Sequence, residues 1–204
     1  GQNHIQGMGI ALFIKRIKIA IETTGGPFGF MAEFGRNLNI IRGRNSSGKS
    51  TIVHSILYAL GMEELIGAQN AEALTYVLKD HVEFDDTKHY VTRSMVIIEM
   101  ESNDKTITIT RKIKEDGVNP KLVEIQECAA LSKGETAPIL YRFLHDAGSA
   151  QLREGFYTYL ENFLGLKLPT VPHTNGKQVK LYLQYIFAAM VIEQKRGWTD
   201  YIAN

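Results

Sequence analysis

Hydrophobic and polar residues alternate from residue 12 to residue 21, and this alternation predicts a β-strand. The turn-forming sequence Gly-Gly-Pro at 25–27 follows, and the next alternating stretch, Phe28–Phe34, is predicted to return as the antiparallel partner. Residues 1–8 carry no such pattern and are interpreted as an expression remnant. The folded domain is therefore expected to span residues 9–204.

From residue 81 the hydrophobic pattern again has a period of two, over several consecutive stretches. Short turns rich in Asp, Asn and Gly separate the stretches, as is typical of hairpin connections. The strands expected from this pattern are His81–Phe84, His89–Glu101, Thr106–Ile113 and Leu122–Glu127. Together they predict an antiparallel meander.

Other stretches have helical spacing. The expected helices are Ser50–Leu60, which ends at Gly61; Glu72–Lys79; Pro138–Asp146; Gln151–Leu164, with Ser149 as its cap; and Val179–Gln194, which begins helical and ends extended. The Pro- and Asn-containing segment Leu168–Gly176 is predicted to be a loop. The order of elements predicts an α/β fold with an added antiparallel β-layer.

A glycine-rich loop lies between the expected strand Asn37–Arg42 and the first expected helix. Residues 43–51 read Gly-Arg-Asn-Ser-Ser-Gly-Lys-Ser-Thr, which matches the phosphate-binding pattern G-x-x-x-x-G-K-[ST]. Backbone amides of such a loop converge on phosphate groups, and the positive end of the following helix favours negative charge. The strand, loop and helix context therefore predicts a P-loop nucleotide site.

The type of each side chain in this loop suggests its role. Lys49 is expected to bridge the β- and γ-phosphates of ATP, and the Ser50 hydroxyl is expected to bind Mg²⁺. Thr51 lies one position later and is expected to reach the α-phosphate instead. The other residues expected to contact the nucleotide are Arg44, Asn45, Ser46, Ser47 and Gly48.

Composition narrows the class of protein. The 204 residues suffice for one substantial core, and 23 Lys and Arg against 22 Asp and Glu do not indicate a heavily basic nucleic-acid binder. A local basic strip of Lys105, Arg111, Lys112 and Lys114 is one interpretation, and a solvated strand face is another. The single cysteine, Cys128, fits a reducing compartment, and no apolar run is long enough to span a bilayer. We expect a cytoplasmic protein, associated with the nucleoid if it is bacterial.

Three stretches resemble the N-terminal half of an ABC-type ATPase head of the Rad50/SMC (structural maintenance of chromosomes) kind. They are Ile40–Thr51 followed by Ser55–Gly61; Val96–Glu101 followed by Thr106–Arg111; and Met190–Gln194. The resemblance implies a P-loop NTPase fold and assigns Gln194 to the Q-loop, where it contacts Mg²⁺ and senses the γ-phosphate. Gln184 is the competing glutamine, although it lies within a helical pattern.

Two motifs of the complete head have no convincing match in this chain. Leu131–Glu135 is similar to a degraded ABC signature, and the apolar run that ends at Glu193 is an alternative Walker B strand. The resemblance implies that a C-terminal half, reached through a coiled coil, carries both motifs, and that two heads dimerise around ATP. The isolated N-terminal lobe is then expected to bind ATP but to hydrolyse it weakly.

The leading functional hypothesis is an ATPase that acts on DNA in repair, chromosome organisation or antiphage defence. The cation and aromatic pattern of Lys195–Trp198 fits phosphate or base contact, or else a solvated turn. Alternatives are a self-contained P-loop small-molecule kinase, a nucleotide switch and an interaction domain with a vestigial loop. The chain lacks the Asn-Lys-x-Asp pattern that recognises guanine in GTPase switches, and its intact Lys49 and Ser50 argue against decay.

Overall fold

A computed structural model describes residues 12–45, 48–67, 70–144, 155–172 and 176–188. The chain divides into two compact units, Gly1–Leu166 and Lys167–Asn204, and each is described by itself. Within the described ranges, no helix is long and apolar enough to cross a membrane.

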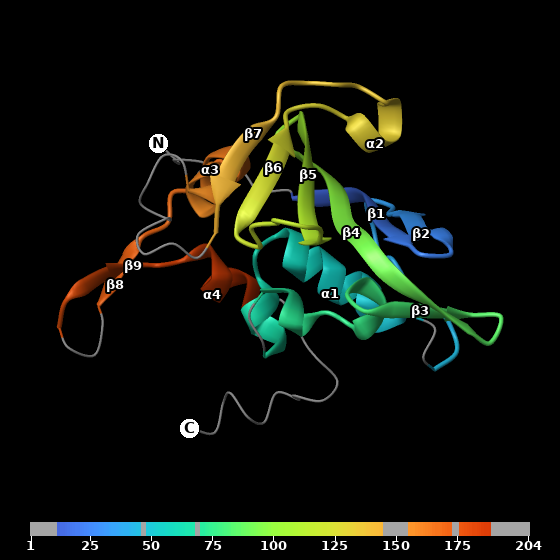
Figure 1. Ribbon diagram of the computed structural model, residues 1–204. Helices are drawn as coiled ribbons and strands as arrows, with labels where there is room; N and C mark the ends of the chain where they lie inside the picture. Colours follow the sequence, from blue (N-terminus) through green and yellow to red (C-terminus); the bar gives the residue numbers. More distant parts are fainter. Residues whose placement is uncertain (1–11, 46–47, 68–69, 145–154, 173–175, 189–204) are drawn as a thin grey trace. The chain divides into compact units, whose positions relative to one another are not determined.

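The first unit is built on a seven-stranded antiparallel sheet (Figure 1). Its strand order is β2-β1-β4-β5-β6-β7, and β3 pairs with β4 off this path. The strands are β1 (Phe13–Thr23), β2 (Gly26–Glu33), β3 (His81–Phe84), β4 (Thr87–Ser102), β5 (Lys105–Lys114), β6 (Leu122–Gln126) and β7 (Leu140–Phe143). The predicted meander is therefore confirmed, and β4 begins two residues before and ends one residue after the predicted strand.

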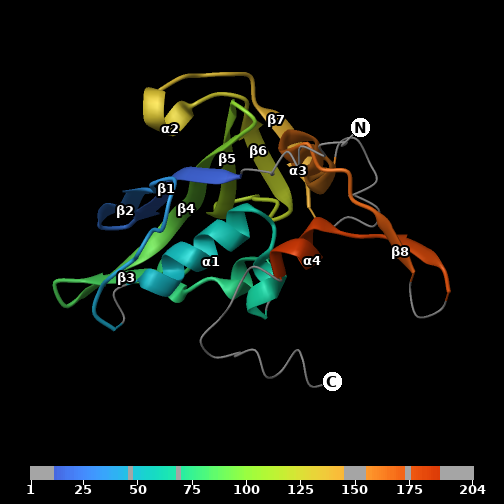
Figure 2. The same cartoon turned by 180° about the vertical axis from the view of Figure 1, so that it is seen from behind.

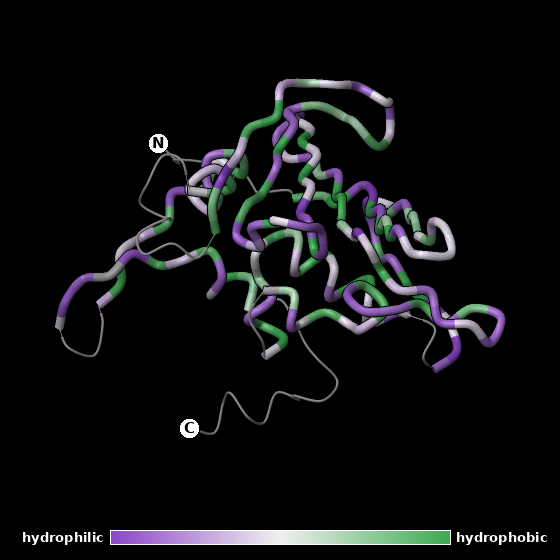
Figure 3. Tube along the Cα trace, in the orientation of Figure 1, coloured by the Kyte–Doolittle hydropathy of each residue, from purple (hydrophilic) through white to green (hydrophobic). Residues whose placement is uncertain are grey.

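The alternation within the strands sorts their side chains onto two faces. Ile17 and Ile19 of β1 and Ile98 of β4 are all less than 5% exposed, whereas the residues between them lie on the opposite face. The same alternation is visible along the strands in Figure 3. Two-residue turns connect β3 to β4 and β4 to β5, and Asp and Asn supply the left-handed backbone that such turns need.

Helix α1 (Lys49–Ala59) packs on β4 and β5, on one face of the sheet (Figures 1 and 2). Gly61 ends this helix, as predicted, because its φ of 71° lies in the left-handed region. The Gly61 N–H donates to the Tyr58 carbonyl at 2.9 Å, and the Met62 N–H donates to the Leu57 carbonyl at 2.8 Å. These two bonds form a Schellman motif, which satisfies carbonyls that the helix end would leave unpaired.

Short helical segments complete the first unit. They are η1 (Glu63–Ile66), η2 (Asn70–Ala73), η3 (Tyr76–Leu78), α2 (Ala130–Lys133) and α3 (Phe156–Leu164). Helix α3 buries an apolar stripe that includes Phe156, Leu160 and Leu164. In the second unit, β8 (Thr170–Pro172) pairs antiparallel with β9 (Gln178–Lys180), and α4 (Leu183–Ala188) follows.

The strand predicted at Asn37–Arg42 is not formed. This segment leads into the glycine-rich loop without pairing with any strand of the described residues. Leu38 and Ile40 are 86% and 79% exposed, so neither side chain is buried against a sheet. A strand needs a neighbouring strand for its backbone hydrogen bonds, and the described part of the chain supplies none for this segment.

Several predicted helices are also wrong. The segment 138–146 contains the strand β7, and 72–79 contains the end of η2 and all of η3 in place of one helix. The helix predicted at 151–164 begins at Phe156, after Gly155, while Ser149 lies outside the described residues. The predicted loop 168–176 contains β8, and the segment that starts at Val179 begins as a strand before α4.

Candidate nucleotide-binding site

The glycine-rich loop ends at the N-terminus of α1. Gly48 is the N-cap of the helix and has φ 84° and ψ 8°, a left-handed conformation that side chains with a Cβ rarely adopt. An added Cβ would meet nothing within 4 Å, so the backbone conformation, not lack of space, requires glycine here. The first turn contains no acidic residue, and its leading amides have no partner within the helix. This end of α1 is therefore suited to an anion.

Lys49 lies at the start of the helix, directly after this glycine. Its Nζ donates to the Gly43 carbonyl at 2.9 Å and to the Arg44 carbonyl at 2.7 Å. The ammonium group is thus held against the loop by two neutral acceptors. Phosphate oxygens carry negative charge and would form stronger, charge-assisted hydrogen bonds with the same group.

The remaining predicted loop residues are placed as follows. Ser50 is exposed in the first turn of α1, and Arg44 and Asn45 are exposed in the loop before it. The Thr51 hydroxyl lies 3.4 Å from the Thr75 hydroxyl, which joins the helix start to the segment before η3. The predicted contacts Ser46 and Ser47 lie outside the described residues, as do Gln194, Glu193 and 195–198. Gln184 lies in α4 of the second unit.

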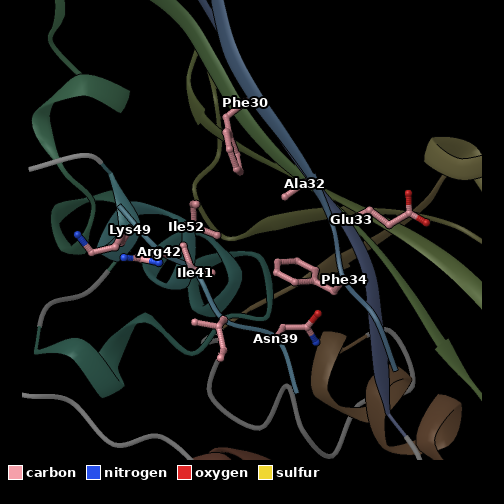
Figure 4. Close-up of a pocket in the computed structure, with 10 residues that line it drawn as sticks. Phe30, Ala32, Glu33, Phe34, Asn39, Ile41, Arg42, Lys49 and Ile52 are labelled. Carbon is pink, nitrogen blue, oxygen red and sulfur yellow. The ribbon is translucent and has the colours of Figure 1, made fainter. Parts of the chain in front are cut away.

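A hollow of about 350 Å³ adjoins the loop (Figure 4). Strand β2 contributes Phe30, the segment before the loop contributes Ile41 and Arg42, and α1 contributes Lys49 and Ile52. Its lining mixes apolar side chains with the polar Glu33, Asn39, Arg42 and Lys49. The hollow is therefore a partly polar depression beside the loop.

Asn39 fixes the shape of the segment that enters the loop. Its Oδ1 accepts the Gly35 N–H at 2.7 Å, and its Nδ2 donates to the Gly35 and Asn37 carbonyls at 2.8 Å and 2.9 Å. These three bonds occupy backbone groups that a strand would use in its ladder. The sequence analysis did not single out Asn39, although Asn side chains commonly hydrogen-bond to nearby backbone groups in turns.

The described residues fit Mg²⁺ only as a P-loop does, in which phosphate oxygens and water supply most of the ligands. In the described part of the chain, no three His, Cys, Asp or Glu side chains come together as a metal-binding group. Mg²⁺ needs few protein ligands when phosphate oxygens and water supply the rest of its octahedron. The exposed hydroxyl of Ser50, the residue after Lys49, fits that arrangement.

A buried ion pair anchors the other end of α1, and the sequence analysis missed it. Arg111 and Glu63 are both 0% exposed, and two hydrogen bonds of 2.9 Å and 2.8 Å join the guanidinium to the carboxylate. The guanidinium also donates to the Tyr58 carbonyl and to the Pro120 carbonyl. It stacks over the Tyr58 ring, with its carbon 3.8 Å from the ring centroid.

The interpretation of Lys105, Arg111, Lys112 and Lys114 as a basic strip is wrong, because Arg111 is buried. Arg111 points into the core, whereas Lys112 faces the other side of the sheet and pairs with Glu115 and Glu124. Lys114 donates to the Lys79 carbonyl at 2.8 Å. The available signal was the position of Arg111 in the alternating pattern, in phase with Ile109 and Ile113.

The signature-like segment Leu131–Glu135 is held on the face of the sheet opposite α1. One oxygen of the buried Glu99 carboxylate accepts the N–H groups of Leu131 and Ser132, each at 2.9 Å. Arg16 donates to the Leu131 carbonyl at 3.3 Å. These contacts give the segment a role in covering the sheet.

Comparison with known proteins identifies the family of this chain. The AAA domain family matches residues 29–142, which is more than half of the chain and includes the loop, α1 and most of the sheet. This chain belongs to the AAA domain family. Its P-loop NTPase class is thereby established, and the resemblance to the N-terminal part of an SMC/Rad50-like ATPase is confirmed.

One relative of this AAA domain is the structural maintenance of chromosomes protein 5 of Schizosaccharomyces pombe. The two are 32% identical over 99 residues, which cover 48% of this chain. The match covers 8% of the length of the relative, so it concerns a small part of that protein.

Proposed function

We propose that residues 9–204 form the ATP-binding N-terminal lobe of an SMC/Rad50-like ATPase head that acts on DNA. Repair, chromosome organisation and antiphage defence are the processes that fit such a head, and the cytoplasm or nucleoid is the matching location. The observation that carries the proposal is the joint geometry of Gly48 and Lys49 at the start of α1. That geometry supplies free amides, a cation held beside the loop and no acidic residue in the first turn of the helix.

In this proposal the loop binds the triphosphate, and Lys49 exchanges its two carbonyl acceptors for β- and γ-phosphate oxygens. Bound Mg²⁺ would neutralise phosphate charge, and Ser50 and Gln194 are its proposed protein ligands. The amides of the loop orient the phosphates, and Thr51 stays beside the α-phosphate. These residues bind and position the nucleotide without activating water.

The exposed segment 37–42 supports a partner for this lobe. Its alternating Leu38 and Ile40 are suited to a buried strand, yet they are 86% and 79% exposed, and Ile40 lines the hollow beside the loop. We propose that strands of a C-terminal half pair with this segment and bring the signature motif and the catalytic carboxylate. A second head would then close over the nucleotide, so that hydrolysis depends on parts outside this lobe.

Calorimetry with Mg-ATP tests the binding step. The chain should bind Mg-ATP, and Lys49→Ala should abolish binding because it removes the cation placed at the phosphates. Lys105→Ala is the matched control, since Lys105 is exposed at the start of β5 and should leave affinity unchanged. Equal affinity of the Lys49→Ala variant and the unmodified chain would show that the loop is not the nucleotide site.

Turnover tests the division of labour between the two halves. The isolated chain should hydrolyse ATP slowly, and addition of the C-terminal half should raise turnover and produce ATP-dependent dimers by light scattering. DNA should then stimulate the assembled head. Rapid hydrolysis by the isolated chain would instead favour a self-contained small-molecule kinase or nucleotide switch.

A further inference from the structure

The contact between Thr51 and Thr75 brings a second segment to the start of α1. Their hydroxyls lie 3.4 Å apart, and Thr75 immediately precedes the short helix η3. Figures 1 and 2 both show β3, which follows η3, beside the beginning of α1. The segment 75–81 therefore borders the position at which Thr51 would meet the α-phosphate.

This bordering segment carries an array of three aromatic rings. The Tyr76 ring centroid lies 5.2 Å from that of His81, with planes inclined by 38°, and His81 lies 6.2 Å from Tyr90. Tyr76 and Tyr90 are 54% and 56% exposed, so both outer rings offer surface to a ligand. The array is an ordered aromatic platform, and we call it the Tyr76 platform.

The central ring of the platform is held in place by its neighbours. His81 Nδ1 lies 2.8 Å from Asp80 Oδ2, and its Nε2 lies 3.3 Å from Glu83 Oε1. Strand pairing sets His81 opposite Tyr90, which fixes the third ring. Both ring nitrogens of His81 are thus engaged, and its ring is adjacent to both tyrosine rings in a tilted arrangement. An aromatic surface fixed in this way loses little conformational entropy when a ligand stacks on it.

We propose that the Tyr76 platform stacks on the base of the nucleotide whose phosphates lie in the P-loop. Tyr76 directly follows Thr75, whose hydroxyl contacts Thr51, so the backbone of Tyr76 lies next to that contact. In a nucleotide, only the ribose stands between the base and the α-phosphate. The inference rests on the proposed function, because it assumes a nucleotide at the loop, and adds what holds the base.

Stacking also defines the class of nucleotide. Base–aromatic stacking tolerates any base because each presents a π-face, and the larger purine ring offers more contact area. The platform should therefore prefer purine over pyrimidine nucleoside triphosphates and separate ATP from GTP only weakly.

The test compares the affinities of Mg-ATP and inorganic triphosphate by calorimetry. Tyr76→Ala should weaken ATP binding roughly 5- to 150-fold, the range for loss of one stacked aromatic, and should leave triphosphate binding unchanged. Tyr76→Leu should behave similarly, since it keeps apolar bulk and lacks the π-face, and it guards against a folding defect in the alanine variant. Tyr141→Ala is the matched control, because Tyr141 is 52% exposed on the edge strand β7.

The outcomes separate this inference from the proposed function. Selective loss of ATP affinity in both Tyr76 variants supports the platform. Unchanged ATP affinity, or equal loss for ATP and triphosphate, overturns the platform while a Lys49-dependent P-loop stands. If Lys49→Ala changes neither affinity, the P-loop and the platform fail together.

Discussion

Removal of Arg111 should destabilise this domain more than any change to a surface cation. Its guanidinium shares two hydrogen bonds with Glu63, and neither side chain is exposed to solvent. Arg111→Met keeps the apolar volume of the stem but leaves the Glu63 carboxylate buried without its counter-charge. The carbonyls of Tyr58 and Pro120 lose a donor in the same step.

The magnitude follows from the kind of pair. Breaking a buried pair by removing one partner costs about 3–5 kcal/mol, because the remaining charge is uncompensated. A domain of ordinary stability has only about 5–15 kcal/mol in total. Arg111→Met should therefore remove about a fifth or more of the unfolding free energy.

Urea unfolding followed by circular dichroism measures this loss. Replacing both partners, as in Glu63→Leu with Arg111→Met, should be less damaging than Arg111→Met alone, since no charge is left buried. Arg93→Met is the matched control, because Arg93 is 41% exposed and its ion pairs should contribute about 1 kcal/mol or less. A loss below about 1 kcal/mol for Arg111→Met would refute the reasoning.

Three further predictions concern the same framework. Gly61→Ala should cost about 1–3 kcal/mol in urea unfolding, because φ is 71° and the new methyl would lie 2.6 Å from Leu144 Cδ2. Burial raises the pKa of Tyr58 from 10.0 to about 12, so the protonated phenol stabilises the fold fully below pH 10, and this contribution is lost as the pH rises toward 12. Unfolding measured at pH 9 and pH 11 should therefore show a smaller decline for Tyr58→Phe than for the unmodified chain. Leu38→Lys should leave the stability of the isolated chain unchanged, because Leu38 is 86% exposed, but should weaken pull-down of the C-terminal half.

The sheet could be predicted because its pattern is local and repeated. Strands β4 and β5 carry long runs of alternating residues, and turns with Asn or Asp mark their ends. The start and end of α1 could be predicted for a similar reason, since Gly48 and Gly61 both adopt the left-handed backbone that glycine favours. In each case the signal lies within a few residues of the feature it specifies.

The missed features depend on partners distant in the sequence. The segment around β7 is too short for its spacing to separate strand from helix, and its pairing with β6 decides the outcome. Arg111 became a core residue because Glu63, 48 positions earlier, supplies a carboxylate. The Thr51–Thr75 contact and the Tyr76 platform likewise arise from tertiary structure.

The segment 37–42, which was predicted to be a strand, bears directly on how this lobe would assemble with a partner. Its residues alternate as those of β1 do, yet Ile19 is 4% exposed while Leu38 and Ile40 are 86% and 79% exposed. A strand-like pattern that the described residues leave exposed supports the proposed pairing with a C-terminal half. Because the same segment runs directly into the loop at Gly43, whatever covers it would also fix the loop from which Lys49 reaches the phosphates. Assembly and nucleotide binding would then be coupled through six residues, and the Leu38→Lys variant should consequently lower ATP affinity only when the C-terminal half is present.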